Sequence, residues 1–354
     1  MRNFGSDKLS ALDAKFEAQK LSFGPIAFQA VRTMRDLGIL ELVENARKEG
    51  ILVDEMVEKL HLSRYGIQVL LDAGISIGVV LQKNDRFLLT KIGYFILNDP
   101  LTRANLDFVQ DVNYLGFYHL DESIKNGKPE GLKVFGDWDT VYEGLASLPP
   151  KVKESWFQFD HYYSDLVFPL VMPLIFADKP KKLLDIGGNT GKFSIKAANY
   201  NPDVHITILD LEGQLKVAKK EIEKAGLSDR IDGYKIDLLN PKLAYPADVD
   251  AIWMSQFLDC FSEKEITHLL SRAYDALIPG GILYINETYW DRQKYPASTY
   301  SLNMTSLYFT AIANGNSRMY HSDDMIKLVK QAGFEIIEDI DGLGVSHTLL
   351  KCKK

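Results

Sequence analysis

The chain has 354 residues, of which 46% are hydrophobic and 25% are charged, so its length allows two domains and its composition is that of a soluble globular protein. A formal net charge of -7 argues against a general nucleic-acid-binding or anionic-membrane-binding protein, because neutralising phosphates requires an excess of Lys and Arg. The two cysteines, Cys260 and Cys352, are too few for a disulfide framework or a Cys-rich metal site.

The N-terminus carries charges throughout and holds no apolar stretch of the kind found in signal peptides. No apolar run in the sequence is long enough to cross a membrane. We therefore expect a cytoplasmic protein that binds neither membrane nor nucleic acid and that uses no metal.

The first strong pattern is an apolar helix face between Phe23 and Val43, where Ile26, Val31, Met34 and neighbouring apolar residues recur at helical spacing. A face this wide needs a large partner surface. We expect it to take part in a homodimer.

Two short helices, 53–60 and 64–73, and then a hairpin of strands 79–82 and 86–89 follow in the order of a winged helix. Such a module suggests DNA binding, but five Lys and Arg residues are balanced by five Asp and Glu residues between residues 51 and 97. Phosphate contacts would therefore be poor, and we interpret the module as a packing or dimerisation element, with a winged-helix regulator as the weaker alternative.

Residues 105–176 are rich in aromatic side chains and are predicted to be helical. Their most unusual piece is WFQFDHYYSD, Trp156 to Asp165. It is interpreted either as an interdomain helix that buries aromatic rings or as the wall of a substrate pocket, because planar ligands are held by aromatic faces. In the second interpretation the substrate contacts are Trp156, Phe159 and Tyr163, and His161 is a polar group within the wall.

The central motif is KKLLDIGGNTG, Lys181 to Gly191, which predicts a buried strand, a tight glycine turn and a helix over 192–200. Glycines suit a sharp turn and allow a ligand to approach the backbone closely. Loops of this kind bind nucleotide-like ligands.

From there to the end of the chain, strand and helix patterns alternate, which predicts a doubly wound α/β domain with its ligand at the carboxyl ends of the strands. The predicted domains are 1–104, 105–176 and 177–354. The predicted strands are 204–209, 231–236, 249–257, 282–286 and an antiparallel pair of 334–340 with 347–351; the predicted helices are 213–225, 322–332 and one opened by a capping box from Ser262 to Glu265.

Acids fall at the strand ends, where a ligand in the crevice meets them. Asp210 is placed to accept hydrogen bonds from two ribose hydroxyls, and Asp237 suits an exocyclic adenine amine. The glycine pattern, Asp-x-Gly-Gly-x-Thr-Gly starting at Asp185, differs from the Gly-x-Gly-x-x-Gly of dinucleotide folds. Together these residues predict S-adenosylmethionine, a cofactor with an adenosine end, an amino-acid end and no phosphate.

The segments LLDIGGNTG, TILDL, KIDLL, SQFLDCFSEKE, PGGILYINET and HSDDMIKLVKQAGF resemble those of the plant-type O-methyltransferases, the caffeate and hydroxyindole O-methyltransferase-like family. The resemblance implies a Rossmann-like class I methyltransferase domain behind an N-terminal winged-helix dimerisation domain. It implies that the glycine loop lines the methionine end, that Asp210 binds the ribose and that Asp237 with Leu238 binds the adenine. The expected cofactor contacts are Asp185, Gly187, Gly188, Gly191, Asp210, Leu211, Asp237, Leu238, Ser255 and Gln256.

The chain departs from the family at the expected site of catalysis. The family's catalytic His falls on Asp259, its cofactor-contacting Lys falls on Ser255, and the second of its two supporting Glu residues falls near Met319, whereas the first is retained as Glu287. The predicted catalytic residues are therefore Asp259, Glu287 and His161, with Asp259 or His161 as the general base. His321 is interpreted as structural, because it directly precedes the helix cap expected at Ser322.

We expect a small phenolic or aryl acceptor, methylated on oxygen or on a ring carbon. The expectation rests on the aromatic residues of segment 156–163 together with Trp253, Tyr289 and Trp290, of which Trp290 is a predicted substrate contact. Two alternatives stay open at this point: presentation of the acceptor by a carrier protein, and a noncatalytic protein that only senses S-adenosylmethionine.

Overall fold

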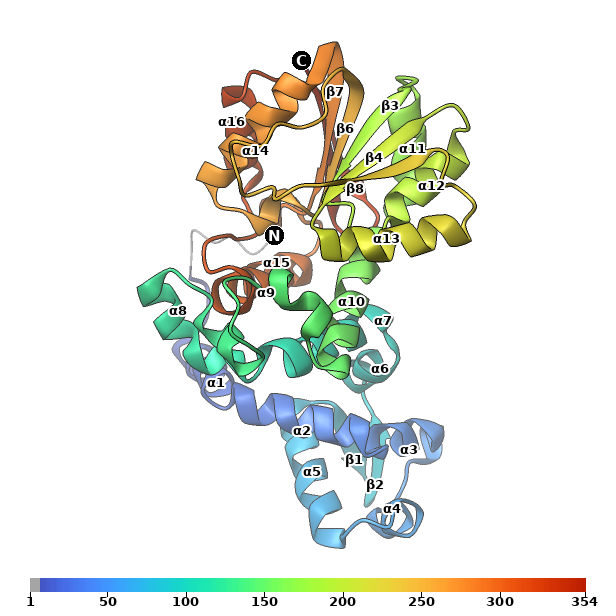
Figure 1. The fold of residues 1–354 in the computed structure, drawn as a ribbon. Coiled ribbons are helices and arrows are strands. Elements are labelled where there is room, and N and C mark those ends of the chain that lie inside the picture. The colour runs from blue at the N-terminus through green and yellow to red at the C-terminus, as the bar shows by residue number, and fades with distance from the viewer. Residues whose placement is uncertain (1–6) are drawn as a thin grey trace. The chain divides into compact units, whose positions relative to one another are not determined.

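The computed structural model describes residues 7 to 354, and the chain divides into two compact units between Val109 and Gln110 (Figure 1). The N-terminal unit is mainly helical and carries a two-stranded sheet. Its elements are α1 (Ala11–Ser22), α2 (Gly24–Asp36), α3 (Ile39–Asn45), η1 (Arg47–Glu49), α4 (Val53–Leu60), α5 (Arg64–Ile77), β1 (Val80–Lys83), β2 (Arg86–Leu89), α6 (Lys91–Asn98) and α7 (Pro100–Phe108).

The helix-turn-helix and hairpin predicted for residues 53–89 are present as α4, α5 and the antiparallel pair of β1 with β2. The single helix predicted over 23–43 is wrong. It is interrupted after Asp36, and Gly38, with φ of 77°, precedes α3. Val31 and Met34 are buried in the core of the unit, whereas Ile26 is 66% exposed, so only part of the predicted apolar face packs within it.

The C-terminal unit begins with a helical region and continues into a seven-stranded sheet. The helical region contains η2 (Val109–Asn113), which starts at the unit boundary, η3 (Gly116–His119), α8 (Leu120–Asn126), η4 (Glu130–Val134), α9 (Val141–Gly144), η5 (Leu145–Ser147), α10 (Pro150–Asp165) and α11 (Phe168–Phe176). The aromatic segment 156–165 thus forms the last part of α10.

The sheet has the strand order β5-β4-β3-β6-β7-β9-β8; the first five strands are parallel, and β9 is antiparallel to both of its neighbours. The predicted doubly wound α/β fold is therefore confirmed. The strands are β3 (Lys182–Ile186), β4 (His205–Asp210), β5 (Ile231–Lys235), β6 (Val249–Ser255), β7 (Leu277–Glu287), β8 (Glu335–Leu343) and β9 (His347–Lys353). The remaining elements are α12 (Lys192–Tyr200), α13 (Glu212–Lys224), η6 (Leu258–Cys260), α14 (Glu263–Ala276), η7 (Trp290–Arg292), α15 (Pro296–Tyr308), η8 (Phe309–Ala313) and α16 (Ser322–Gln331).

One strand differs from its predicted bounds. β7 begins at Leu277 rather than at Ile282, because the segment Pro279 to Gly281 lies inside the strand as an irregularity: Val249 pairs with Leu277, but Ala251 pairs with Ile282. The extra residues bulge out of the ladder. Beyond the bulge, pairing with β6 is regular up to Ser255 and Asn286.

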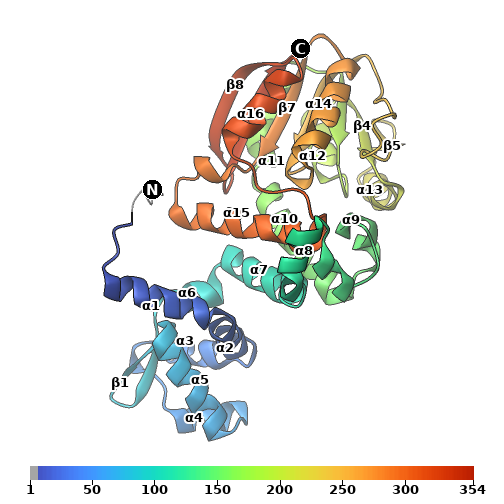
Figure 2. The ribbon, with the colours of Figure 1, turned by 90° about the vertical axis from the view of Figure 1, so that its left-hand side faces the viewer.

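Side chains alternate between two cores on the two faces of the sheet. Leu184 and Ile186 face α14 and α16, whereas Leu183 faces the side covered by α11, α12 and α13 (Figures 1 and 2). Trp253 belongs to the second core: it is 1% exposed and stacks on Phe193 with ring centroids 4.4 Å apart. Trp253 and the equally buried Tyr289 are therefore core residues, and the expectation that their rings help bind an aromatic substrate is wrong.

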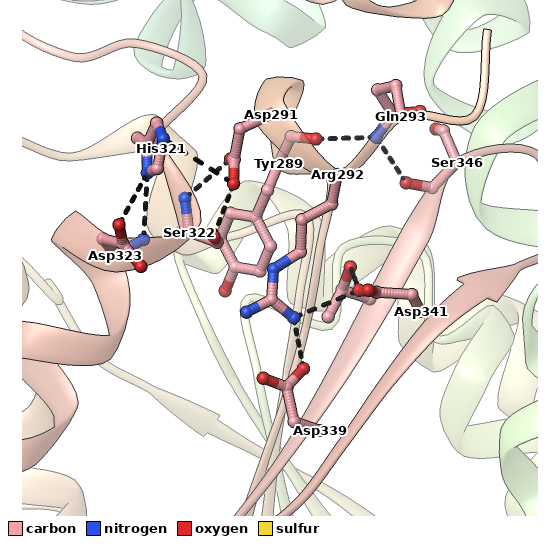
Figure 3. A network of polar contacts seen from close by, with 11 residues as sticks. Tyr289, Asp291, Arg292, Gln293, His321, Ser322, Asp323, Asp339, Asp341 and Ser346 are labelled. Carbon is pink, nitrogen blue, oxygen red and sulfur yellow. Dashed lines mark hydrogen bonds and ion pairs between the residues drawn. The ribbon is translucent and has the colours of Figure 1, made fainter. Parts of the chain in front are cut away.

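The segment after β7 is held by a polar network, drawn in Figure 3. The backbone N–H and the hydroxyl of Ser322 donate to Asp291 at 2.8 and 2.6 Å, and Gln293 donates to the carbonyls of Tyr289 and Ser346. Arg292 pairs with Asp339 and Asp341 of β8. These contacts fix the position of η7, and with it the point at which the chain enters α15.

The same network corrects the predicted cap of α16. The cap residue is His321, whose Nδ1 accepts a hydrogen bond from the N–H of Asp323 at 3.1 Å, whereas the Ser322 hydroxyl is used as a donor to Asp291. The ring of Trp290 packs edge-on against His321, with centroids 5.0 Å apart. His321 therefore has a structural role, as expected, but by a different contact.

The predicted capping box of α14 is confirmed, since the Ser262 hydroxyl accepts from the N–H of Glu265 and the Glu265 carboxylate accepts from the N–H of Ser262. We expect Ser262→Ala to lower the free energy of unfolding by about 1 kcal/mol, because one N–H at the helix start loses its acceptor. Urea denaturation followed by circular dichroism measures the change. Thr267→Ala on the same helix is the matched control: its exposed hydroxyl only bonds back to Glu263, so an equal loss in both variants would contradict the capping role.

Candidate functional site

The glycine loop joins β3 to α12 at the carboxyl edge of the parallel strands. Gly187 and Gly191 have φ of 71° and 78°, values that favour glycine. A Cβ on Gly187 would overlap the ring of Phe257, and one on Gly188 would lie 2.7 Å from Asp185 Oδ2. The first two glycines are therefore required by close packing, and they bring the loop against the segment that follows β6.

Asp185, the last polar residue of β3, is buried beneath this loop. The Ser194 hydroxyl of α12 donates to its Oδ2 at 2.6 Å, and burial raises the pKa of the carboxyl to about 7. The bond ties the first turn of α12 to the strand. Asp185 thus packs against Gly188 and supports the conformation of the loop.

Asp210 and Asp237 stand at the ends of neighbouring strands, since β4 pairs with β5 and the N–H of Ile236 donates to the Asp210 carbonyl. The Asp210 carboxylate accepts from the N–H groups of Asn189 and Leu211 at 2.9 and 2.7 Å, while burial raises its pKa to about 6. Asp237 is exposed, with one oxygen bonded to the N–H of Leu239. The two acids lie at the edge of the sheet where the glycine loop also lies, since the N–H of Asn189 in that loop donates to Asp210.

Three polar side chains lie at the ends of β6 and β7. Asn286 donates to the Ser255 hydroxyl at 2.8 Å, and the N–H of Gln256 donates to the Asn286 carbonyl at 3.0 Å. Asn286 Oδ1 and Gln256 Oε1 are buried acceptors to which no donor within residues 7–354 is hydrogen-bonded. Buried acceptors without donors are costly, and a site with two of them fits a ligand that brings N–H groups.

The loop that carries Asp259 is fixed from three directions. Glu287 Oε1 accepts from the N–H groups of Phe257 and Leu258 at 2.9 and 2.8 Å. On the other side of Asp259, Asn314 donates to the Cys260 carbonyl and the Tyr320 hydroxyl donates to the Phe261 carbonyl, both at 2.6 Å. Asp259 is therefore held on a rigid turn, 6% exposed.

Burial shifts the pKa of Asp259 on this turn and that of Glu287 at the end of β7. It raises the pKa of Asp259 to about 6, with only the Cys260 thiol, 3.5 Å from Oδ1, as a side-chain donor. Burial and the Asp259 charge raise the pKa of Glu287 well above its ordinary value, and no described residue donates to Glu287 Oε2. Two carboxyl groups this close cannot both ionise freely at neutral pH.

A third acid, Asp160 on α10, was missed by the sequence reasoning. Burial raises its pKa to about 7, and the strongest charge acting on it is that of Asp259. Trp156, one helical turn earlier, donates from Nε1 to the Tyr308 hydroxyl of α15 at 2.7 Å, which sets the orientation of α10. The sequence signal that could have identified Asp160 is an acid one helical turn after Trp156, inside an aromatic segment.

His161, the neighbour of Asp160 in sequence, has a different environment. Its ring centroid lies 5.5 Å from that of Phe157, and its pKa is lowered by burial and by Lys192, with Asp165 acting in the opposite direction. Asp259 is not among the charges that act on it. The structure thus groups Asp259 with Asp160 and Glu287, and places His161 beside the Lys192–Asp165 ion pair, whose atoms are 3.0 Å apart.

The other predicted substrate contacts lie in two places, on α10 and in η7. Trp156 lies beside Tyr308, and Phe159 packs on Tyr163 with centroids 5.1 Å apart on α10. Trp290 lies in η7 against His321. Met319, where the family has its second Glu, is buried, and its sulfur accepts from the Thr288 hydroxyl at 3.5 Å.

Within residues 7–354 there is no group of three or more His, Cys, Asp or Glu side chains arranged to hold a metal ion. A separate search of the same residues finds no helix long and apolar enough to cross a membrane.

Comparison with known proteins gives two family matches and several relatives. Residues 15–87 match the Dimerisation2-like domain, and residues 117–335 match the O-methyltransferase domain. The L-tyrosine C(3)-methyltransferase of Streptomyces lavendulae is 27% identical over 326 residues, 90% of this chain and 87% of that protein. The bacteriochlorophyllide d C-20 methyltransferase of Chlorobaculum tepidum is 26% identical over 204 residues, 57% of this chain and 55% of that protein.

Among solved structures, the apo form of the S-adenosylmethionine-dependent methyltransferase SibL superposes with a TM-score of 0.72 at 24% identity, covering 95% of this chain and 98% of that one. At this identity the likeness establishes the fold.

The packing of the glycine loop yields a prediction about the ligand in the crevice. We expect Gly187→Ala to weaken the binding of S-adenosylhomocysteine about tenfold or more, because a Cβ at positive φ adds strain of about 1–3 kcal/mol and pushes on Phe257. Isothermal titration measures the affinity. Gly213→Ala is the control: nothing lies within 4 Å of its Cβ position, and its affinity should equal that of the unmodified protein. Equal affinities in all three proteins would contradict the role of the loop.

Proposed function

The chain belongs to the O-methyltransferase domain family and is an S-adenosylmethionine-dependent methyltransferase, and we propose that it methylates a small phenolic or aryl acceptor at the Asp259 turn. The observation that carries the proposal is the contact between Gly187 and Phe257, because it sets the donor loop directly against the turn that holds a buried acid. Donor and acceptor sites thus share one scaffold.

The residues present fit the cofactor. The unpaired acceptors Gln256 Oε1 and Asn286 Oδ1 suit the ammonium of its methionine end, and the Asp210 carboxylate keeps lone pairs for the ribose hydroxyls beside its two backbone donors. Asp237 and Leu238 are the proposed adenine contacts. When bound, S-adenosylmethionine supplies an electrophilic methyl group on a sulfonium sulfur.

We assign the general base to Asp259. A phenolate is far more nucleophilic than a phenol, and a carboxylate within hydrogen-bond reach of the acceptor removes the proton as transfer proceeds. Burial makes Asp259 a stronger base than an ordinary Asp, because its pKa of about 6 lies closer to that of a phenol. This is how an Asp can take the place of the family's His.

Glu287 acts in this proposal as a positioning residue. Its Oε1 accepts from the two backbone N–H groups that precede Asp259, at 2.9 and 2.8 Å, and burial with the Asp259 charge raises its pKa well above the ordinary value. His161 stays a second candidate for the general base, because it lies on α10 within the aromatic segment proposed to contact the acceptor.

The acceptor is proposed to be aromatic because α10 presents Trp156, Phe159 and Tyr163 on the segment next to Asp160, and because the tyrosine C(3)-methyltransferase that the chain resembles is named for a phenolic substrate. Aromatic faces with few polar groups among them hold planar rings.

The test is methyl transfer from labelled S-adenosylmethionine to a panel of phenols as a function of pH. We expect kcat/KM to rise tenfold per pH unit below about pH 6 and to level above it, because Asp259 accepts a proton only in its ionised form and its pKa is about 6. Asp259→Asn should lower kcat by about 10² to 10⁴ at neutral pH.

Glu154→Gln, an exposed change on α10, is the control and should leave the rate and the pH profile unchanged. If Asp259→Asn keeps full activity while His161→Ala loses it, the base is His161. Binding of S-adenosylmethionine without transfer to any phenol would favour a noncatalytic sensor.

We also propose that the chain forms a homodimer through its N-terminal unit. The match to a dimerisation domain covers residues 15–87 of this unit, and α1 buries none of its residues. Leu12 is 78% exposed and Phe16, one turn on, is 59% exposed. An exposed apolar row of this kind marks a protein interface.

We expect the double variant Leu12→Asp with Phe16→Asp to shift the protein from dimer to monomer, because two charges would have to be buried without partners. Light scattering after size-exclusion chromatography measures the mass. Ala18→Asp, which places the same charge on the opposite side of α1, should remain dimeric. A monomeric unmodified protein would refute the proposed dimer.

A further inference from the structure

A buried arginine holds the loop that joins β5 to β6. Arg272 lies on α14 with 9% of its surface exposed, and its Nη1 donates to the main-chain carbonyls of Asn240 and Leu243, both at 3.1 Å. Its Nη2 donates to the carbonyl of Leu238, and its Nε donates to that of His268, one turn earlier on α14, at 3.4 Å. Three carbonyls of the loop and one of the helix thus surround a single guanidinium group.

The contacts of Arg272 differ from those of an ordinary buried cation. Among residues 7–354, every hydrogen bond of its guanidinium goes to a main-chain carbonyl. Buried charges are normally paired with an opposite charge, because removing them from water is costly. The ring of Tyr245, itself 6% exposed, covers the guanidinium, with its centroid 4.7 Å from Cζ. An arginine bound in this way fixes the backbone of the loop and does not neutralise an acid.

The loop needs such support because it has no regular structure of its own. Residues 236–248 form neither helix nor strand, and residues 241–244 are exposed. Carbonyls outside a helix or a strand ladder find donors only in side chains, turns or water. Two turns organise the loop, since the N–H of Asn240 donates to the Asp237 carbonyl and the N–H of Leu243 donates to the Asn240 carbonyl, both at 3.2 Å. Arg272 bonds to both turns and therefore fixes them relative to α14.

The same loop carries the proposed adenine contacts. The side chain of Leu238 lies in the core on the α14 face of the sheet, and its carbonyl is bonded to Arg272, so the backbone at this position is held twice. Asp237 directly precedes it and is exposed, with one carboxylate oxygen accepting from the N–H of Leu239 at 3.0 Å. The position of the Asp237 carboxylate therefore depends on the loop backbone that Arg272 fixes.

Building on the proposed function, in which Asp237 and Leu238 contact the adenine, we infer that Arg272 is the positioning residue that makes the cofactor site selective for adenine. Adenine offers an exocyclic amine to the Asp237 carboxylate, whereas hypoxanthine has a carbonyl oxygen at that place, so that two acceptors would face each other. A polar group discriminates between such ligands only when the residues around it hold it in place. A mobile carboxylate would turn away from the wrong base and lose the discrimination.

An arginine is required at this position by geometry. Its planar guanidinium presents five N–H donors in a rigid fork, whereas lysine has three donors on one nitrogen. The two Nη atoms of Arg272 bond to the carbonyls of three separate loop residues. An ammonium group at the same place keeps the charge but does not bridge those carbonyls. Arg272→Lys therefore tests the fork separately from the charge.

The experiment compares two ligands that differ only at the amine of the base, S-adenosylhomocysteine and S-inosylhomocysteine, by isothermal titration with the full-length protein. We expect the unmodified protein to bind the adenine compound about 10- to 100-fold more tightly, which is the effect of one hydrogen bond to a charged group. Arg272→Lys should weaken binding of S-adenosylhomocysteine about tenfold and leave that of S-inosylhomocysteine nearly unchanged, so that the ratio of the two affinities falls about tenfold. In the methyl-transfer assay, the KM for S-adenosylmethionine should rise while kcat and the KM for the acceptor stay the same.

The matched control is Arg230→Lys. Arg230 also donates to main-chain carbonyls, those of Ala198 and Asn201 at 2.8 and 3.1 Å, but it directly precedes β5, at the opposite edge of the sheet from Asp237. Its variant should keep the affinity ratio of the unmodified protein. A purely structural loss in either variant would lower the fraction of protein that binds, without changing the ratio of the two affinities.

A second variant decides the question if circular dichroism shows that Arg272→Lys does not fold. Tyr245→Leu uncovers the guanidinium and should lower the affinity ratio, whereas Tyr245→Phe should keep it, because no described residue is hydrogen-bonded to the Tyr245 hydroxyl. An unchanged ratio in Arg272→Lys, or in Tyr245→Leu in its place, overturns the role of Arg272. Equal affinity of the unmodified protein for the two ligands overturns this inference and leaves the proposed function standing. No binding of either ligand overturns both.

Discussion

The hydrogen bonds from the N–H groups of Phe257 and Leu258 to one oxygen of Glu287 are the junction on which the catalytic edge of the sheet depends. A typical intramolecular hydrogen bond contributes about 0.5–1.5 kcal/mol, and breaking these two would leave three buried polar groups unpaired. The junction fixes Phe257 against Gly187 and Asp259 against α10 at the same time. The glycine loop and the turn that carries Asp259 are thus positioned by one side chain at the end of β7.

Much of the fold was predictable because its signals are local. The helix predicted over 192–200 has those bounds in the structure, and the strand predicted over 204–209 is shifted by one residue to His205–Asp210. Glycine turns, helix caps and apolar runs depend on residues close in sequence. The carboxyl ends of parallel strands lie at one edge of the sheet, so the strand pattern alone places Asp210 beside Asp237. The predictions that proved wrong depend on nonlocal packing: the break before Gly38, and the bulge that extends β7 back to Leu277. The predicted domain limits at 104 and 176 stay predictions.

The site was only partly predictable, because its chemistry is assembled from segments far apart in sequence. Asp259 was found because the family's catalytic His falls on it, but Asp160 lies 99 residues earlier and is distinguished only by what surrounds it. The sequence alone also does not distinguish a partly exposed aromatic ring from one in the core. Trp253 and Trp156 both have apolar or aromatic neighbours in sequence, yet Trp253 stacks on Phe193 in the core of the sheet, whereas Trp156 donates a hydrogen bond to the Tyr308 hydroxyl. Burial decides the difference, and burial is a property of the assembled unit.

In the proposed mechanism, a carboxyl at position 259 in place of the family's imidazole changes the charge at the moment of transfer. Methyl transfer from a sulfonium to a phenolate removes one positive and one negative charge, so an additional ionised carboxylate nearby stabilises the reactants more than the transition state and slows the step. A carboxylate that has already taken the phenolic proton is neutral at that point, whereas a histidine in the same role would carry a positive charge. Burial that raises the pKa of Asp259 therefore has two effects in one direction: it strengthens the base and keeps the acid neutral while the methyl group moves. Glu287 fixes the turn through the N–H groups of Phe257 and Leu258, and burial with the Asp259 charge raises its pKa, which disfavours a second carboxylate charge there.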